Sequence, residues 1–341
     1  MLRMKSRKAP RPAAAWLLAI MALLFIAGCG REPGANARVM KVVLLLDSRM
    51  DPLRNMQWLL LDNLVKQKAG NDFYWWDAGA DEKKQAAQLS EAMKLKPDVL
   101  MVFPVKSAGI SDALKVARLG GSQVYVFADD MPEAACTSAI FCDERKVGRM
   151  AGEFIVQSVR QKMAEEGRPE AIGRVVNFTG PDDSPASAQR KEGFAEAFAQ
   201  EPGILIVHQA PVGLLGEGMP DRIAEALNLQ KNFDVVFAHN DIMARAAATA
   251  LVKAGQRNNV LVMGVDGAPG KGGGIQMVTR SEIDATVYHP PLVDYAWSLV
   301  LRGLREPGFK PAPRHELPPV LINLEEAIEW ARVGPPPAKP D

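Results

Sequence analysis

The chain has 341 residues, which is enough for two folded lobes that each bury a hydrophobic core. Hydrophobic residues make up 48% of it, a composition typical of a globular protein. Its 41 Lys and Arg residues balance 40 Asp and Glu residues. The resulting net charge of +1 gives no electrostatic footprint for nucleic acid.

The first 28 residues have the layout of a secretion signal. Residues 1–11 carry five basic side chains and no acid, and an uncharged apolar run fills residues 13–28. The run ends in residues 26–29 (IAGC), which resemble the lipobox of bacterial lipoproteins. That resemblance implies lipidation of Cys29, a tether over residues 29–38, and a folded part held at a membrane surface outside the cytoplasm. The alternative is an uncleaved anchor, because the apolar run is nearly long enough to span a bilayer.

From residue 39 onward, short apolar runs alternate with helical patterns. The runs that predict strands are VMKVVLLL, FYWW, DVLMVF, QVYVFA, TSAIF, RVVNFT, ILIVHQA, DVVFA, VLVMGV, ATVY and PVLIN. The predicted helices cover about residues 53–69, 81–95, 107–119, 143–166, 187–200, 218–231, 241–254, 274–281 and 291–305. This alternation predicts an α/β protein with parallel sheets built from right-handed crossovers, and the number of strands favours two sheets.

Polar side chains follow nearly every predicted strand. Residues 235–238 (VVFA), for example, run directly into His239, Asn240 and Asp241. One such junction is explained by helix capping, because Asn and Asp satisfy the free N–H groups of a first helical turn. Carboxylates, amides and an Arg at strand ends in both halves exceed what capping needs. Since ligands of parallel sheets bind outside the carboxyl ends of the strands, the pattern predicts a binding site there.

Several motifs in chain order resemble the periplasmic sugar-binding proteins, in particular the ribose- and galactose-binding proteins of ABC importers. They are VVFAHNDIMARAAATALVKAG, VLVMGVDG and DATVYHPP, together with AQRKEGFAEAF, which matches an Arg-x-x-Gly-Phe helix, and DERKVGRMAGEFI, which matches the helix after the first crossover. The resemblance covers residues 39–323.

The resemblance implies two Rossmann-like lobes with parallel sheets, joined by three hinge crossovers, which is the type I periplasmic binding protein fold. We expect an N-terminal lobe over residues 39–142 plus 290–317 and a C-terminal lobe over residues 143–289 plus 318–333. A disordered tail is expected at residues 334–341. The ligand is expected in the cleft between the lobes, and the lobes are expected to close on it.

Carried over by position, the resemblance also implies a binding set. Asn240, Asp266 and Arg190 correspond to the polar clamp of the second lobe, and Asp129 to the acceptor of the first. The full expected set is Asp51, Arg54, Phe103, Asp129, Asp130, Cys142, Arg190, Asn240, Asp266 and His289. These residue types suit a hydroxylated ligand, because carboxylates accept hydrogen bonds, amides donate and accept, and a guanidinium donates through a planar fork.

The chain departs from the family pattern at the aromatic positions that stack on a sugar ring. Leu53 and Arg54 hold those places after the first strand, and Leu214 and Leu215 hold them in the second lobe. Asp130 stands where ribose binders carry an Arg. These changes disfavour ribose and a flat-stacked pyranose. Trp75 and Trp76 are expected to pack in the core.

The expected function is capture of a small polyhydroxylated ligand, a monosaccharide or polyol, for delivery to the permease of an ABC importer. The protein is expected to be a lipid-anchored monomer without cofactor or metal. Two alternatives remain: a sensing module of the same fold coupled to a membrane sensor, and a binder of a nucleoside or sugar acid. An enzyme is disfavoured, because residues 267–274 (GAPGKGGG) lack phosphate-loop spacing and the four His residues lack metal-ligand spacing.

Cys136 and Cys142 are predicted to be free thiols. The extended run TSAIF between them places their Cα atoms roughly 20 Å apart, at about 3.3 Å per residue. A disulfide needs about 4.4–6.8 Å.

Overall fold

The computed structural model describes residues 39–67, 70–168, 172–181, 184–199 and 201–336. The predicted signal sequence, the lipidation site Cys29, the tether up to residue 38 and the last part of the predicted tail lie outside these residues. Within the described ranges, no helix combines the length and the apolar character needed to cross a bilayer.

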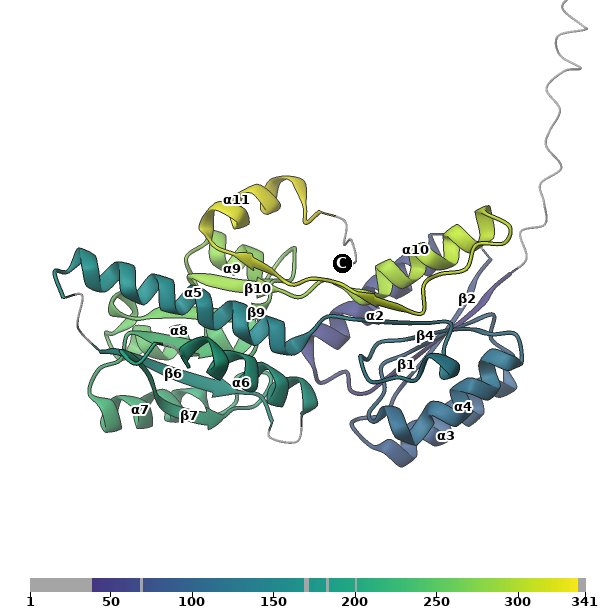
Figure 1. Cartoon of the computed structure of the whole chain (residues 1–341), viewed down its shortest axis with the longest axis horizontal. Coiled ribbons are helices and arrows are strands. Elements are labelled where there is room, and N and C mark those ends of the chain that lie inside the picture. The colour runs from purple at the N-terminus through teal and green to yellow at the C-terminus, as the bar shows by residue number, and fades with distance from the viewer. Residues whose placement is uncertain (1–38, 68–69, 169–171, 182–183, 200, 337–341) are drawn as a thin grey trace, which may run out of the picture. The chain divides into compact units, whose positions relative to one another are not determined.

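The strands of the described residues form two six-stranded sheets (Figure 1). The first sheet has the order β11 (Arg314–Glu316), β5 (Ser138–Phe141), β4 (Gln123–Val126), β3 (Val99–Val102), β1 (Lys41–Leu46) and β2 (Asp72–Asp77). The second has the order β12 (Val320–Ile322), β10 (Ala285–Tyr288), β9 (Leu261–Asp266), β8 (Val235–Ala238), β6 (Gly173–Thr179) and β7 (Ile204–Pro211). All neighbours are parallel except β10 and β12. The prediction of two α/β lobes with mostly parallel sheets is confirmed.

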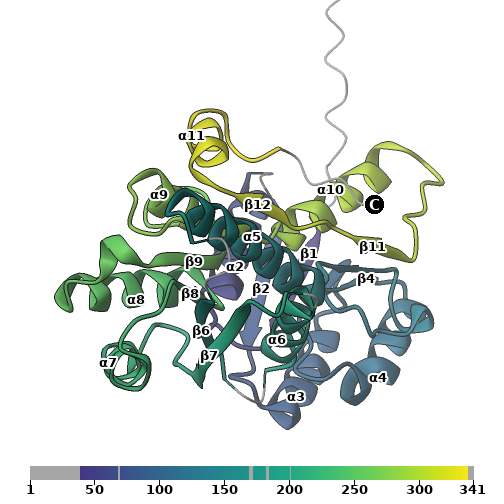
Figure 2. The same cartoon turned by 60° about the vertical axis from the view of Figure 1, so that its left-hand side comes forward.

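Helices connect the strands and cover both sheets (Figure 2). Those of the first part are α2 (Pro52–Lys66), α3 (Glu82–Lys94), α4 (Ser107–Leu119) and α5 (Glu144–Glu165). The later ones are α6 (Pro185–Phe198), α7 (Met219–Gln230), α8 (Asp241–Lys253), α9 (Gly274–Thr279), α10 (Leu292–Arg305) and α11 (Leu324–Val333). The chain passes three times between the sheets: from β5 through α5, from β10 through α10, and directly from β11 to β12.

Side chains of each strand alternate between the two faces of the sheet, and this alternation explains why helices cover both faces. Val42, Leu44 and Leu46 of β1 belong to one buried cluster with side chains of α2 and α10. Val43 and Leu45 belong to another cluster with side chains of α3 and α4. Successive side chains point to opposite faces, so a strand that is apolar at every position needs a helical layer on each side. The second sheet is covered in the same way, by α5 and α6 on one face and by α7, α8 and α9 on the other.

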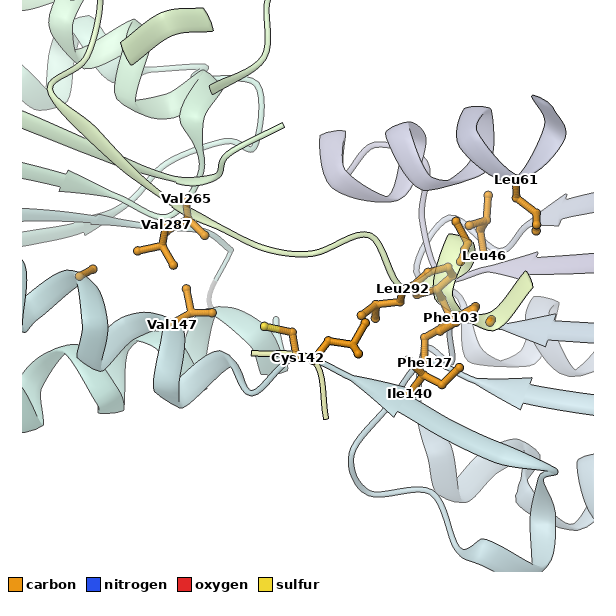
Figure 3. Close-up of a cluster of buried hydrophobic side chains, with 14 of the residues drawn as sticks. Leu46, Leu61, Phe103, Phe127, Ile140, Cys142, Val147, Val265, Val287 and Leu292 are labelled. Carbon is orange, nitrogen blue, oxygen red and sulfur yellow. The ribbon is translucent and has the colours of Figure 1, made fainter. Parts of the chain in front are cut away.

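Cys142 lies at the first passage between the sheets. In Figure 3 it sits between the aromatic rings of Phe103 and Phe127 on one side and Val265 and Val287 on the other. Cys136 and Cys142 are both buried and unpaired, on either side of β5. The prediction of free thiols is therefore confirmed.

Among the strands and α-helices, two were not predicted from the sequence. β11 has only three residues and no apolar run. α11 follows directly after β12, and its N-cap Asn323 forms a capping box with Glu326. That box was a usable signal, because Asn followed three residues later by Glu before an apolar pattern marks a helix start.

Helices α5 and α6 approach each other through two glycines. A Cβ atom on Gly148 would collide with the backbone carbonyl of Arg190, and one on Gly193 would collide with the backbone carbonyl of Arg145. The close approach fixes the start of α5 against the middle of α6. That contact brings Glu144 to Arg190, as described below.

We predict that Gly148→Ala lowers the free energy of unfolding by about 1–3 kcal/mol, because the added methyl group has no space. The matched control is Gly303→Ala in α10, where the added Cβ would lie 3.9 Å from Phe309. Alanine there removes backbone freedom from the unfolded chain and should be neutral or stabilising by up to about 1 kcal/mol. Urea unfolding of both variants tests this. Equal stability of the two would contradict the close packing of α5 on α6.

Candidate functional site

A cavity of about 430 Å³ opens at the carboxyl ends of the strands. One side is formed by the segment from Arg49 to Met56, after β1. The other side is formed by Leu215, the start of α8, Asp266 and the loop 268–274. Of the residues predicted from the sequence to bind ligand, Asp266 alone lines this cavity. Leu53 and Leu215, which stand at the family's aromatic positions, line it as well.

Asp266 is an unpartnered acceptor at the wall of the cavity. It is the last residue of β9 and only 7% exposed, yet no hydrogen-bond donor of the described residues reaches its carboxylate. Its backbone has φ +107°, a conformation that side-chain-bearing residues rarely adopt and that costs on the order of 1–3 kcal/mol. Burial, followed by the neighbouring carboxylate of Asp241, holds the pKa of Asp266 well above its ordinary value. A ligand that enters the cavity can therefore form a hydrogen bond with this carboxyl group.

Asp241 holds the turn that carries Asp266. Its Oδ2 accepts a hydrogen bond from the Gly267 N–H at 2.7 Å, and its Oδ1 accepts one from the Thr286 hydroxyl at 2.6 Å. Gly264 and Gly274 enclose it so closely that a Cβ atom on either would collide with the carboxylate. Asp241 therefore positions the Asp266–Gly267 peptide while its own oxygens stay engaged.

The pH dependence of this arrangement is testable. Burial raises the pKa of Asp241 from 3.8 to about 7, against the opposing effects of the two hydrogen bonds and of Arg190. Between the ordinary pKa of 3.8 and the raised pKa of about 7, Asp241 therefore keeps its proton in the folded state and releases it in the unfolded chain. The stability contribution of Asp241 is therefore full below about pH 4 and is lost as the pH rises toward 7.

We predict that Asp241→Asn becomes more stable relative to the wild type as the pH rises from about 4.5 to about 7.5, because Asn never has to ionise. Urea unfolding at several pH values measures the difference. The control is Asp221→Asn, at an exposed position in α7. A stability difference between Asp241→Asn and the wild type that stays constant with pH would refute the raised pKa of Asp241.

Asn240 caps the helix that follows β8, as one of the two explanations for the polar residues 239–241 predicted. It is the N-cap of α8: its Oδ1 accepts from the Met243 N–H at 2.7 Å, and its Nδ2 donates to the Leu214 carbonyl at 2.9 Å. Its neighbour His239 is buried, and burial lowers the pKa of that imidazole to about 3, so it is neutral. Capping therefore accounts for the acceptor of Asn240, and one amide hydrogen remains for a further partner.

Arg190 is buried and already engaged. Its Nε donates to Glu144 Oε2 at 2.5 Å, its Nη2 donates to Glu144 Oε1 at 3.0 Å, and its Nη1 donates to the His239 carbonyl. His289 is also buried, with Nε2 at 3.5 Å from Glu144 Oε1 and Nδ1 at 3.0 Å from the Pro290 carbonyl. Burial raises the pKa of Glu144, but Arg190 and His289 outweigh it, and the net pKa lies far below the ordinary value. Glu144 was not predicted as a site residue.

The predicted residues after β1 are partly engaged with each other. Asp51 is the N-cap of α2 and accepts from the Leu53 N–H at 2.8 Å. Arg54 lies 3.2 Å from Asp47 and places its guanidinium 4.5 Å from the ring centre of Phe103. Phe103 is buried and also stacks on Phe127, so its ring is a fixed surface against which the guanidinium of Arg54 packs.

The remaining predicted residues of the first lobe lie after β4 and β5. Asp129 and Asp130 are exposed in a bend. The carbonyl of Asp129 accepts from Arg314 at 2.6 Å, and the carboxylate of Asp130 accepts from the Ser107 hydroxyl. Cys142 is buried, and burial raises the pKa of its thiol well above the ordinary value.

Predicted residues from both halves of the chain come within electrostatic reach of each other. Arg190 is influenced by the carboxylates of Asp266 and Asp51, and Asp266 is influenced by Asp51 and Glu144. Asp47, Glu144 and Asp241 belong to the same neighbourhood and were missed as site residues. Asp47 stands directly after β1, and Glu144 and Asp241 stand three residues after the ends of β5 and β8, so the polar segments that follow the strands contained the signal for them.

The two neighbouring tryptophans differ in environment. Trp76 packs against the core of the first lobe, whereas Trp75 is 37% exposed and contacts Trp58 with ring centres 5.0 Å apart. The guanidinium of Arg49 lies over both Trp58 and Trp75, at 4.0 and 4.7 Å from the ring centres. Neither Trp75 nor Trp76 lines the cavity. Across the described part of the chain, no group of three His, Cys, Asp or Glu residues is arranged to hold a metal ion.

Comparison with known proteins places this arrangement in context. Residues 61–300 match the family model described as periplasmic binding protein domain. The ribose import binding protein RbsB of Escherichia coli (strain K12) is 27% identical over 231 residues, which cover 66% of this chain and 71% of that protein.

Two solved structures share the fold. The myo-inositol binding protein of Caulobacter superposes with a TM-score of 0.69 at 22% identity, covering 86% of this chain and 97% of that one. The fructose-binding periplasmic domain of a hybrid two-component system superposes with a TM-score of 0.70 at 23% identity, covering 86% and 93%.

Proposed function

The chain belongs to the periplasmic binding protein domain family, and from this premise we propose that it captures a small, uncharged polyhydroxylated ligand in the cavity beside Asp266. Members of this family are solute-binding proteins that act outside the cytoplasm, and the chain is not an enzyme. The observation that carries the proposal is the buried, strained and unpartnered carboxylate of Asp266. A ligand hydroxyl supplies the donor that this carboxylate lacks.

The ligand class follows from the chemistry of the cavity. Asp266 offers a hydrogen-bonding carboxyl group, and Leu53 and Leu215 provide apolar surface for C–H groups. Hydroxyl groups match the first, and the carbon skeleton of a sugar or polyol matches the second. The similar proteins named above are named for ribose, myo-inositol and fructose, which are all neutral and rich in hydroxyl groups.

The proposed mechanism is closure of the two lobes on the ligand. The chain crosses between the sheets three times, and these crossings serve as the hinge. Contacts from the Arg49–Met56 side and from Asp266 are made together only in the closed form, so ligand stabilises that form. A permease of an ABC importer then recognises the closed form and accepts the ligand.

A second candidate function is ligand sensing. It is favoured by the similarity to the fructose-binding domain of a two-component system, in which a binding module of this fold serves a sensor. Uptake of radiolabelled ligand by cells lacking this protein separates the two: loss of uptake supports the importer, and normal uptake with a lost transcriptional response supports the sensor.

We predict that Asp266→Ala weakens binding by about 2 kcal/mol, or roughly thirtyfold, because a ligand hydroxyl loses its hydrogen-bond partner in the cavity. A thermal-shift screen of monosaccharides and polyols first identifies the ligand, since a compound that binds the folded state alone raises its melting temperature. Calorimetry then compares the wild type, Asp266→Ala and the exposed control Asp221→Ala. Unchanged affinity of Asp266→Ala would remove the residue from the site.

We also propose that Cys29 carries the lipid anchor. The basis is the IAGC sequence after an apolar run. Cys29→Ser should abolish lipid attachment and leave a soluble or unprocessed protein, since several acyl chains are needed for firm membrane attachment. Membrane fractionation with metabolic labelling by palmitate measures this. A processed Ser variant that still sediments with membranes would disprove the anchor.

A further inference from the structure

A second cavity, of about 410 Å³, adjoins the ligand cavity and shares Met56 and Pro269 with it. Its walls are mostly apolar, and Asp294, in the first turn of α10, is the one charged residue among the described residues that line it. Pro335 and Pro336, at the end of the last described range, form part of the wall. This cavity, which we call the proline groove, therefore receives the chain as it leaves α11.

Both lobes contribute to the proline groove. Helix α2, which provides Leu59 and Leu60, packs on the first sheet. Tyr288 ends β10 of the second sheet, and Trp330 of α11 packs against the Tyr288 ring with ring centres 5.0 Å apart. In both views the chain leaves α11 in the direction of α10 (Figures 1 and 2). A segment bound in the groove therefore contacts the two lobes together.

Asp294 is an acid without a cationic partner among the described residues. Its Oδ1 accepts a hydrogen bond from the Tyr295 N–H at 2.7 Å, and no Lys or Arg of the described ranges pairs with it. Burial raises the pKa of the Asp294 carboxyl above its ordinary value. A cation in the groove would offset the effect of burial, because an opposite charge nearby favours the ionised form of a carboxyl group.

The five residues that follow Pro336 supply both kinds of group that the groove can bind. They read PAKPD and lie outside the described part of the chain. Pro337 and Pro340 continue the proline run, and Lys339 is the one cation among the five. An extended proline-rich chain advances about 3.1 Å per residue, so Lys339 is within about 9 Å of Pro336. Since Pro336 and Asp294 line the same groove, Lys339 is placed to reach Asp294.

We propose that residues 337–341 bind in the proline groove of the same molecule, with their proline rings on the apolar wall and Lys339 paired with Asp294, and so form a strap between the two lobes. Proline-rich segments suit such a groove, because their extended conformation is already formed before binding and little entropy is lost. The strap adds a non-covalent link to the three covalent crossings between the sheets. It assigns a bound state to a tail that composition alone predicts to be disordered.

NMR relaxation of the full-length, deuterated and isotopically labelled protein measures the mobility of the tail without any ligand. The amides of Ala338 and Lys339 are the reporters, because proline has no N–H. We expect order parameters near those of a folded backbone, about 0.85, whereas an unbound tail gives values below about 0.6.

Three variants test the two kinds of contact. Lys339→Gln and Asp294→Asn each remove one charge of the pair, and Leu59→Ser removes apolar surface from the wall. Each should lower the order parameter of Ala338 toward the range of an unbound tail. The matched control is Leu229→Ser, at an exposed Leu of α7 that does not line the groove, and it should leave Ala338 unchanged. Because Lys339 lies in the tail, its variant does not depend on the folding of the others.

Single-molecule energy transfer tests the link between the lobes. Dyes carried by unnatural amino acids at Lys115 of α4 and Lys253 of α8, both exposed, report on the separation of the first lobe from the second. Deletion of residues 337–341 should lower the mean transfer efficiency of the ligand-free protein, because the lobes can then separate further. An unchanged efficiency would overturn the strap.

Other outcomes are equally decisive. Order parameters below about 0.6 for Ala338 and Lys339 in the wild type overturn the proposal. An ordered tail that none of the three variants mobilises overturns it as well. Order that is lost on dilution would show that the tail binds a second molecule and would overturn binding within the same chain. None of these results bears on the proposed function, which depends on Asp266 and the ligand cavity.

Discussion

The buried pair of Glu144 and Arg190 organises the strand ends of the second lobe. Glu144 is the first residue of α5, the helix at the first passage between the sheets. His289 directly follows β10, before the second passage, and its Nε2 lies 3.5 Å from Glu144 Oε1. Transfer of two charges out of water costs several kcal/mol per ion, and this cost is offset only by good geometry and additional hydrogen bonds. The two-pronged contact and the bond to the His239 carbonyl meet that requirement. Loss of either partner would leave the other buried and uncompensated, so α5, α6 and the end of β8 depend on the pair together.

The same edge contains a second arrangement in which one polar group supports another. Asp241 uses both oxygens to hold the Gly267 N–H and the Thr286 hydroxyl, and glycines at 264 and 274 leave room for nothing larger beside it. Its neighbour Asp266 is held in a strained backbone conformation with a free carboxylate. Strain that the surroundings maintain at one acceptor, beside groups that are fully satisfied, is typical of a preorganised binding site.

Sequence reasoning predicted the sheets well, and one residue of the expected binding set, Asp266, lines the cavity. The strands were readable because a strand covered on both faces is apolar at nearly every position, as residues 41–46 show. Asp266 was readable because it follows such a run at a strand end. The pairing of Arg190 with Glu144 could not be predicted from the sequence. Glu144 lies 46 positions earlier, and the two side chains meet only because two glycines let α5 and α6 approach each other. The helix α11 was missed although Asn323 and Glu326 carried the local signal, and β11 offered none, since three residues without an apolar pattern are set by pairing with β5 alone.

The central claim is that a neutral ligand lies at the strand ends against Asp266. A crystal structure of the protein with the sugar or polyol that raises its melting temperature tests this most directly. The account predicts ligand density between Asp266 and the Arg49–Met56 segment, with at least one ligand hydroxyl donating to the Asp266 carboxylate and with the Glu144–Arg190 pair unbroken. Ligand bound away from this edge, or bound here with Asp266 still lacking a donor, would contradict it.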